Sequence, residues 1–342
     1  MCRAFAIAAA VLLLCLASVA QADVFNLGPG LTNLETVAVR DPGNTADTWF
    51  DASVDYNYNI GKYEVTAKQY TDFLNAKAKT DTFGLYSTYM ADTSLASRGC
   101  NIQRSGTSGN YSYSLASDWA NRPVNYVNFW DACRFANWLG NGQGEGDTET
   151  GAYTLNGYSG QDGRTINRNA VATWAVASEA EWYKAAYYKG GGTNAGYWDY
   201  PMQSDYPMTP GNTVVNPDPG NSANYRMNMN YSIGGPYYRT NVGEFENSAS
   251  AYGTYDQGGN VWEWNDTITY ETSERVYRGC RGSSFYYSDS SMLQATYRSG
   301  RITSIDGYDV GFRVSEVVPE PASIIALAAG LVSLLGIRRR RA

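Results

Sequence analysis

The sequence predicts one α+β domain in which loops outweigh helices and strands. Apolar residues recur at helical spacing in only three well-separated stretches, 67–79, 129–139 and 179–189. Short runs in which aromatic and small residues alternate favour strands between and after them. The 342 residues include 35 glycines, which indicates many turns. No segment recurs, so a repeat architecture is not predicted.

The three helices are predicted by their ends as well as by their spacing. Thr66 is a good N-cap for the first helix, and Gly140 stops the second. Ser178 and Glu181 form the S-x-x-E pattern of a capping box at the start of the third helix. In such a box each residue's side chain bonds the other's backbone N–H, so this helix start is the most definite local prediction.

Strands are predicted wherever aromatic or β-branched residues alternate with small or polar ones. Residues 81–118 show no period and are rich in Ser, Gly and Tyr, which predicts a long ordered loop. The predicted strands are 56–63, 122–128, 153–155, 241–245, 276–279, 284–287 and 310–314.

Residues 252–264, YGTYDQGGNVWEW, combine more unusual requirements than any other stretch. Their glycines allow sharp turns, and Asp256, Asn260 and Glu263 supply oxygen-bearing side chains within eight residues. Hard oxygen ligands on a glycine turn suit a cation such as Ca²⁺. A tight turn that leads into a core strand explains the same pattern, and the spacing alone leaves both interpretations open.

Composition excludes several classes of function. The chain contains no histidine, which removes Ser-His-Asp and Cys-His catalysis, His-ligated zinc and His-containing iron sites. It has 26 Lys+Arg against 33 Asp+Glu and no basic stripe, so nucleic acid is not an expected partner.

Paired carboxylates could hydrolyse a glycoside, but no pair has supporting spacing, and a solvated acidic rim is the better interpretation. The carboxylates considered are Glu244, Glu246, Asp289, Asp306 and Asp309.

Both ends of the chain predict export. Residues 1–22 have Arg3, an apolar run and a small-residue A-x-A end, as in a secretory signal peptide. A lead-in segment, 23–56, follows. At the other end Pro319, Glu320 and Pro321 precede an apolar stretch of sixteen residues and four arginines. These two ends contain five of the 26 basic residues and one of the 33 acidic residues. The remaining 21 basic and 32 acidic residues give the body a net charge of about −11. An acidic exported surface suits solubility and cation binding.

The order of parts in 318–342 closely resembles the PEP-CTERM sorting signal. The resemblance implies transient membrane anchoring and removal of the tail by an exosortase, with delivery to the cell envelope, cell surface or extracellular matrix. An ordinary tail anchor is the alternative.

Three cysteines remain in the body, Cys100, Cys133 and Cys280, and one pair of them is expected to bridge in an oxidising compartment.

Seven short motifs between residues 57 and 315 resemble, in order, the formylglycine-generating (sulfatase-modifying factor) domain. This resemblance implies a variant of the C-type-lectin-like fold with little regular structure. The motifs are Tyr63-Glu64-Val65-Thr66, Arg122-Pro123-Val124, Asp131-Ala132, Ser178-Glu179-Ala180-Glu181-Trp182, Gly259-Asn260-Val261-Trp262-Glu263-Trp264, Arg281-Gly282-Ser283-Ser284-Phe285 and Gly311-Phe312-Arg313.

The resemblance also implies calcium ligands. One site would use the side chains of Asp256 and Glu263 with the carbonyls of Gly259 and Val261. A second family site would begin with the Asn224 side chain and the Tyr225 carbonyl. The aspartate expected about ten residues further on is missing from this sequence, which puts the second site in doubt.

Catalysis in this family resembles a copper(I)-dependent oxidation that needs two cysteines spaced C-x₄-C. The matching positions here are Tyr287 and Met292, and neither offers the thiolate that Cu(I) requires. Ser284 matches a family active-site serine. Iron of the ergothioneine type would need histidines. Copper and iron are therefore not expected, and no catalytic residue is assigned.

Two hypotheses remain. In the first, an exported binding or structural module holds a glycan, peptide or matrix component in an aromatic groove near Tyr287. In the second, the chain is an active oxidoreductase of the superfamily, of the formylglycine-generating or non-haem iron type. The groove residues are Ser284, Tyr286, Tyr287, Met292, Arg298 and Arg301. Arg298 or Arg301 would clamp an anion, although ordinary salt bridges are the default interpretation.

Glu64 and Arg313 are expected to form a partly buried ion pair.

Overall fold

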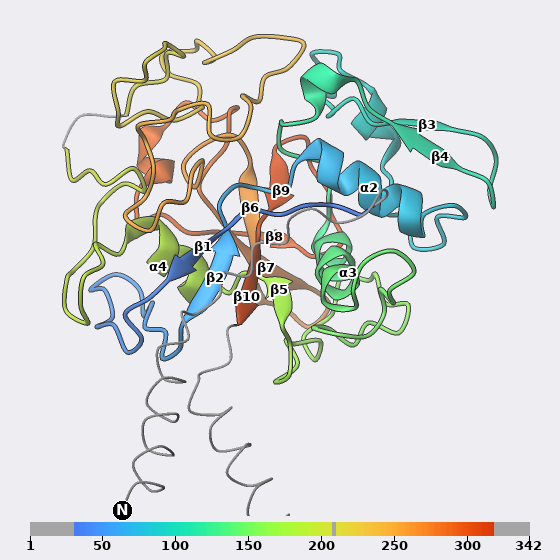
Figure 1. Ribbon diagram of the computed structural model, residues 1–342, viewed down its shortest axis with the longest axis horizontal. Coiled ribbons are helices and arrows are strands. Elements are labelled where there is room, and N and C mark those ends of the chain that lie inside the picture. The colour runs from blue at the N-terminus through green and yellow to red at the C-terminus, as the bar shows by residue number, and fades with distance from the viewer. Residues whose placement is uncertain (1–30, 207–209, 318–342) are drawn as a thin grey trace, which may run out of the picture.

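A computed structural model describes residues 31–206 and 210–317 (Figure 1). The predicted signal peptide, 1–22, and the predicted sorting signal, 318–342, with Pro319, Glu320 and Pro321, lie outside these residues. Within them no helix has the length and apolar character needed to cross a membrane. The helices are α2 (Ala67–Lys77), α3 (Phe129–Gly140) and α4 (Glu179–Tyr187), with three 3₁₀ turns, η1 (Thr88–Ala91), η2 (Ser117–Trp119) and η3 (Ser290–Leu293).

The strands form two four-stranded sheets and one hairpin. The first sheet has the order β1-β2-β10-β5 and the second β8-β7-β6-β9. The strands are β1 (Thr36–Val39), β2 (Tyr58–Gly61), β3 (Gln103–Ser105), β4 (Ser112–Ser114), β5 (Trp174–Val176), β6 (Trp262–Glu271), β7 (Val276–Arg281), β8 (Ser299–Ile302), β9 (Val310–Phe312) and β10 (Val314–Val317). The predicted α+β class is confirmed.

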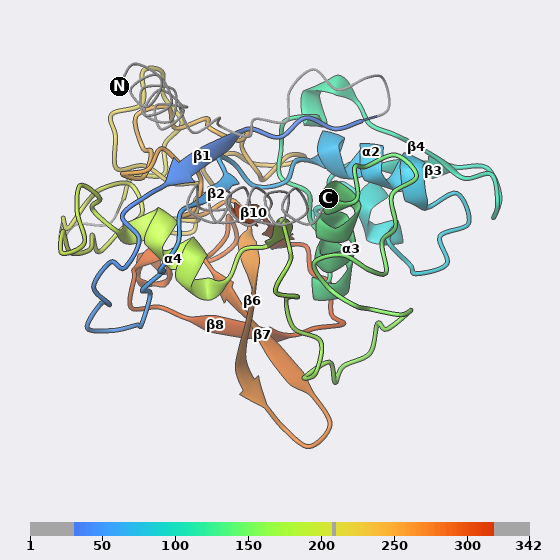
Figure 2. The ribbon, with the colours of Figure 1, turned by 60° about the horizontal axis from the view of Figure 1, so that its bottom comes forward.

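Arg313 joins the two four-stranded sheets. It is the single residue between β9, which pairs with β6, and β10, which pairs with β2 and β5. The predicted strand at 310–314 is therefore interrupted at Arg313, whose side chain is fully buried. The β6–β7 hairpin projects from the body (Figure 2), and β6 is buried at its start and exposed at its end.

The helix starts follow the predicted capping chemistry. Thr66 accepts a hydrogen bond from the N–H of Gln69, whose side chain accepts one from the N–H of Thr66. Ser178 and Glu181 form the same reciprocal pair at α4, which confirms the predicted capping box. Two orphan backbone donors are satisfied at each start, which fixes where the helix begins.

Aromatic side chains fill the core between the helices and the sheets. Phe73, Phe135 and Trp138 of α2 and α3 pack at ring-centroid distances of 5.2–5.6 Å. Trp264 packs edge-on against Phe129, and its indole N–H donates to the carbonyl of Val127 at 2.9 Å. A second cluster of buried residues lies between α4 and strands β1 and β2. The indoles of the 252–264 stretch are therefore core residues.

Four predicted strands are wrong. Residues 122–128 pair only through a bridge between Pro123 and Thr66, and Asn128 caps α3. Residues 153–155, 241–245 and 284–287 lie in turns and loops. Their alternation comes from burial against other loops, which period alone does not distinguish from a strand. The predicted loop 81–118 contains the 3₁₀ turn η1 and the β3–β4 hairpin, and η2 begins at its end.

The cysteine prediction is also wrong. Cys100, Cys133 and Cys280 are all free, and all are fully buried. Burial raises the pKa of each thiol above its usual value. They act as small apolar core residues rather than as cross-links.

Candidate functional site

The turn before β6 has a strained backbone. Asp256, Gly259 and Asn260 all have positive φ, of 59°, 91° and 55°. A Cβ at Gly259 would stand 2.4 Å from the carbonyl oxygen of Asn224, so only glycine fits there. This close approach forms a bridge in which the N–H of Asn260 donates to the Asn224 carbonyl at 2.8 Å. The structure thus brings the two groups of predicted calcium ligands side by side.

Two asparagines hold this contact together. The side-chain oxygen of Asn260 accepts hydrogen bonds from the Asn224 amide at 2.7 Å and from the N–H and hydroxyl of Thr240 at 3.1 and 3.0 Å. Asn224 is 1% exposed, and its own side-chain oxygen is buried without a hydrogen-bond partner. The Tyr225 carbonyl accepts from Asn212 and Ser232. The Asn224 oxygen is an acceptor that a donor or a cation would satisfy.

The predicted Glu64–Arg313 ion pair is wrong. Arg313 pairs instead with Glu263, with two hydrogen bonds, one of them 2.7 Å from Nη2 to Oε1. The indole N–H of Trp182 also donates to Glu263, at 2.7 Å. Glu64 follows β2 and lies near the guanidinium, but the bidentate geometry belongs to Glu263 on β6.

Glu64 is consequently a buried carboxyl group without partners. It is 1% exposed, and no residue in the described part of the chain hydrogen-bonds either of its oxygens. Burial, together with Asp256 and Glu263 nearby, raises its pKa well above its usual value. Burial likewise raises the pKa of Asp256 to about 7. Three carboxyl groups, two of them fully buried, therefore lie near one guanidinium, and only Glu263 hydrogen-bonds to it.

A cation would balance the charge that these carboxyl groups carry when they are ionised. Within 31–206 and 210–317, no three Asp, Glu or Cys side chains converge as a ready metal cluster. Both Glu263 oxygens are engaged by Arg313 and Trp182. A cation here would need backbone carbonyls, such as those of Gly259 and Val261, beside Asp256.

The residues at the two copper-cysteine positions pack against the core. Tyr287 is half-buried, and its ring lies 5.8 Å from Trp262, centroid to centroid. Met292 in η3 packs against the same apolar cluster. Ser284 is fully buried, and its hydroxyl accepts from the N–H of Tyr286 at 3.3 Å. Ser284, Tyr286 and Tyr287 lie together on the 284–287 turn.

The two arginines predicted for the groove are engaged by carboxylates. Arg298 pairs with Glu179 of α4, which also pairs with Arg281 at 2.8 Å. Arg301 pairs with Asp309 at 2.9 Å. The salt-bridge interpretation is therefore confirmed. The contacts of Arg298 are with Glu179 and with the ring of Phe50, rather than with Tyr286 or Tyr287.

Four of the five acidic residues considered for glycoside hydrolysis have structural partners. Asp289 caps η3, and Glu246 accepts from the N–H of Asp218. Glu244 accepts from Asn241, and Asp309 is occupied by Arg301. Each of these four carboxylates has a structural partner of its own.

Sequence reasoning missed two other arginines near Tyr286. Arg98 and Arg226 lie over the Tyr286 ring at 5.1 and 4.9 Å from its centroid. Arg98 also lies over Tyr308 at 5.2 Å. These residues come from loops far apart in the chain. The one available signal in the sequence was for Arg226, which directly follows Asn224 and Tyr225, two of the predicted calcium ligands.

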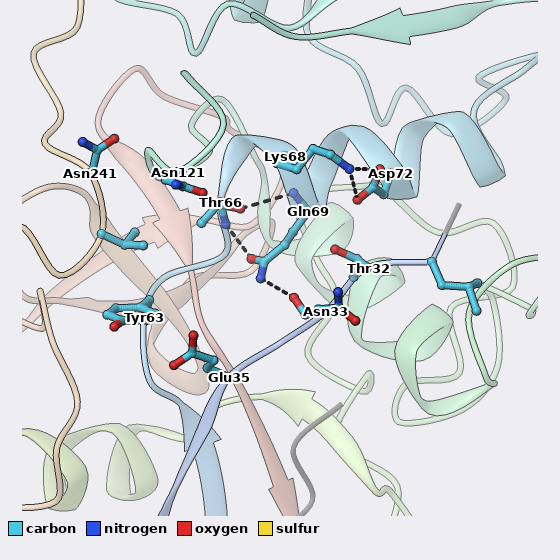
Figure 3. Close-up of a pocket in the computed structure, with 12 residues that line it drawn as sticks. Thr32, Asn33, Glu35, Tyr63, Thr66, Lys68, Gln69, Asp72, Asn121 and Asn241 are labelled. Atoms are coloured by element: carbon cyan, nitrogen blue, oxygen red, sulfur yellow. Dashed lines mark hydrogen bonds and ion pairs between the residues drawn. The ribbon is translucent and has the colours of Figure 1, made fainter. Parts of the chain in front are cut away.

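A polar pocket of about 560 Å³ lies at the start of α2 (Figure 3). Gln69 links Thr66 to the carbonyl of Asn33, and Lys68 pairs with Asp72 at 2.6 Å. None of the predicted site residues lines this pocket. Several of its polar groups bond one another, so it offers few free groups to a ligand.

Comparison with known proteins identifies the class. The family model of the sulfatase-modifying factor enzyme 1-like domain, FGE-sulfatase, matches residues 41–317. The chain belongs to this family. No curated protein matches the chain.

Three solved structures are similar, and the first of them shares the fold. The crystal structure of CarF shares 20% identity and a TM-score of 0.52, over 84% of this chain and 99% of that one. Treponema denticola variable protein 1 shares 18% identity and a TM-score of 0.49, over 85% and 98%. PvdO from Pseudomonas aeruginosa shares 16% identity and a TM-score of 0.45, over 87% and 100%.

Proposed function

We propose that this chain is an exported, envelope- or surface-directed binding module on the formylglycine-generating scaffold. Its ligand would be a glycan, a peptide or a matrix component, held by the aromatic surface around Tyr287. The observation that carries the proposal is the pair Tyr287 and Met292, which stand at the two copper positions and pack against the core. Cys280 is fully buried with a raised pKa, so it does not replace the missing thiolates.

Export rests on the two ends of the chain. Residues 1–22 would direct secretion, and the tail at 318–342 would anchor the chain transiently until an exosortase-type enzyme removes it. The domain would then reside at the cell envelope, the cell surface or the extracellular matrix.

We also propose that calcium stabilises the turn before β6. Asp256 would contribute its side chain, and Gly259 and Val261 would contribute carbonyls. Glu263, the other predicted side-chain ligand, is held by Arg313 and Trp182, so it would ligate the ion only by giving up one of these hydrogen bonds. The unpartnered oxygens of Glu64 and Asn224 support a cation nearby, because unsatisfied buried oxygens are costly. The ion would neutralise buried charge and fix the strained turn.

The aromatic site is tested with Tyr287→Ala. Ligands selected on glycan and peptide arrays should lose about tenfold or more in affinity, because the substitution removes a half-buried ring from the contact surface. Thermal unfolding should show that the variant remains folded. Tyr270→Ala is the matched control, since that tyrosine is 61% exposed on the β6–β7 hairpin and should leave binding unchanged.

Unchanged affinity in Tyr287→Ala would refute the aromatic site. Stoichiometric copper or iron in the purified chain, or oxidation of a cysteine-containing peptide, would favour the oxidoreductase instead.

A further inference from the structure

Four arginines form a connected group without carboxylate partners. Arg122 donates to the carbonyl of Arg239, and Arg239 donates to the carbonyls of Arg98 and Gly99 at 2.8 and 2.9 Å. Arg98 and Arg226 both lie over the ring of Tyr286. In the described part of the chain, none of these four takes part in an ion pair, although Arg134, Arg281, Arg298, Arg301 and Arg313 all do.

Arg98 and Arg226 are the half-buried members of this group, and their hydrogen-bonding capacity is not used by the described residues. The Nε atoms of Arg98 and Arg226 are buried and lack hydrogen-bond partners. Neither guanidinium donates a hydrogen bond to any described residue, while both side chains are half-buried. Neither arginine forms an ion pair with a described carboxylate, so each guanidinium keeps a charge without a hydrogen-bonded counter-ion. An anion at this place would satisfy both the charge and the donors.

The backbone around this site is held in unusual conformations. Arg98 and Tyr238 have φ of 53° and 57°, in the left-handed region that non-glycine residues seldom adopt. The Arg98 guanidinium lies over Tyr238 at 5.5 Å as well as over Tyr286 and Tyr308. Such strain persists only where surrounding structure imposes it, and it is typical of functional sites.

We propose that Arg98 and Arg226, with the rings of Tyr286 and Tyr308, bind the acidic groups of a polysaccharide. This inference rests on the proposed binding function and names the class of its ligand. A guanidinium recognises carboxylate or sulfate groups through its parallel N–H donors. Tyrosine rings and hydroxyls beside them suit the apolar faces and hydroxyls of sugars.

The surroundings favour a sugar over a peptide. Arg98, Arg226, Tyr286 and Tyr308 all lie outside helices and strands, so the site presents no free strand edge to which an extended peptide could add. The acidic group would come from uronate or from sulfate esters, and these share the same chemistry at the guanidiniums.

The test measures binding of the full chain to four probes by calorimetry at low ionic strength. The probes are an oligogalacturonate, a sulfated dextran, an unmodified dextran and poly-glutamate. We expect one or both acidic polysaccharides to bind, in a salt-sensitive manner, and unmodified dextran not to bind. Which acidic probe binds more tightly distinguishes carboxylate from sulfate.

Arg226→Gln and Arg98→Gln should each weaken binding by about tenfold or more, because each removes charged hydrogen bonds to the ligand. Arg104→Gln is the matched control. Arg104 also lies over two tyrosine rings, Tyr86 and Tyr111, but it already pairs with Asp81, so its loss should leave binding unchanged.

Several results would overturn the inference. Equal binding of unmodified dextran, tighter binding of poly-glutamate, or unchanged affinity in both arginine variants would each do so. If a probe still depends on Tyr287 in those cases, the proposed binding module stands and only the acidic-glycan ligand fails. Absence of binding to all four probes and to the arrays would overturn both.

Discussion

Arg313 shows how a single side chain can hold two sheets together. Besides its pair with Glu263, it donates to the carbonyls of Gly61 and Tyr255 at 2.9 Å each. These acceptors come from β2, from β6 and from the turn before β6. Because the guanidinium is fully buried, each of its acceptors depends on it for both charge and hydrogen bonding.

Arg313→Met should therefore cost about 3–5 kcal/mol in free energy of unfolding. The substitution leaves Glu263 buried without its partner, beside the carboxyl groups of Glu64 and Asp256. Urea denaturation in the presence of a chelator measures the loss without a contribution from metal. Lys62→Met is the control, because Lys62 pairs with Glu35 at the surface and should cost less than about 1 kcal/mol. A loss for Arg313→Met as small as the control would contradict the prediction.

The start of α4 concentrates interactions on one buried carboxylate. Glu181 accepts from the N–H of Ser178 at 2.7 Å, from two Arg168 nitrogens at 2.8 and 2.9 Å, and from the hydroxyls of Tyr56 and Ser315 at 2.8 Å. Burial opposes ionisation of this group, but Arg168 and the hydrogen bonds prevail and lower its pKa to about 2. The helix, strand β10 and the Arg168 loop are thereby tied at one point.

This arrangement predicts an acid-sensitive contribution to stability. The folded pKa of Glu181 lies below its unfolded value, so the contribution is complete above about pH 4.5 and is lost as the pH falls towards 2. Glu181→Gln should cost about 3 kcal/mol at pH 7 and clearly less at pH 3. Denaturant unfolding at both pH values checks this, with the exposed Glu271→Gln as the control. An equal cost at pH 7 and pH 3 would contradict it.

Elements defined by local chemistry could be predicted from the sequence, and those defined by distant contacts could not. The caps at Thr66 and Ser178 act within four residues of chain, so their patterns locate α2 and α4. Residues 241–245 and 284–287 alternate like strands, yet no neighbouring strand pairs with them. Pairing depends on what the rest of the chain brings alongside, which the alternation alone does not contain.

The candidate site follows the same division. The glycine turn and its contact with Asn224 join residues that the family motifs had marked. Arg98 and Arg226 were missed because they stand out only by forming no ion pair. Ion pairs become visible only once the chain is folded. The predicted pairing of Glu64 with Arg313 failed because three carboxyl groups lie near this guanidinium, and the sequence does not show which of them it pairs with.

For the whole molecule, calcium removal is the informative experiment. Elemental analysis of the purified chain should find about one calcium per chain and no stoichiometric copper or iron. A chelator should lower the melting temperature, and calcium should restore it, with a gain of about 2.7 kcal/mol at a hundred times the dissociation constant. Magnesium at the same concentration is the control, because it tolerates irregular coordination poorly. A melting temperature indifferent to chelator, in a calcium-free protein, would remove calcium from the proposal.

The position of β10 has a consequence for how the molecule is made. This strand lies between β2 and β5, and the Arg313 beside it bonds a residue 252 positions earlier. The first sheet therefore stays open, with β2 and β5 unpaired to each other, until Val317 has been synthesised. Contacts of such long sequence separation form slowly. The growing chain thus remains without this inner strand until residue 317 has been added, so the first sheet is among the last parts of the fold to be completed.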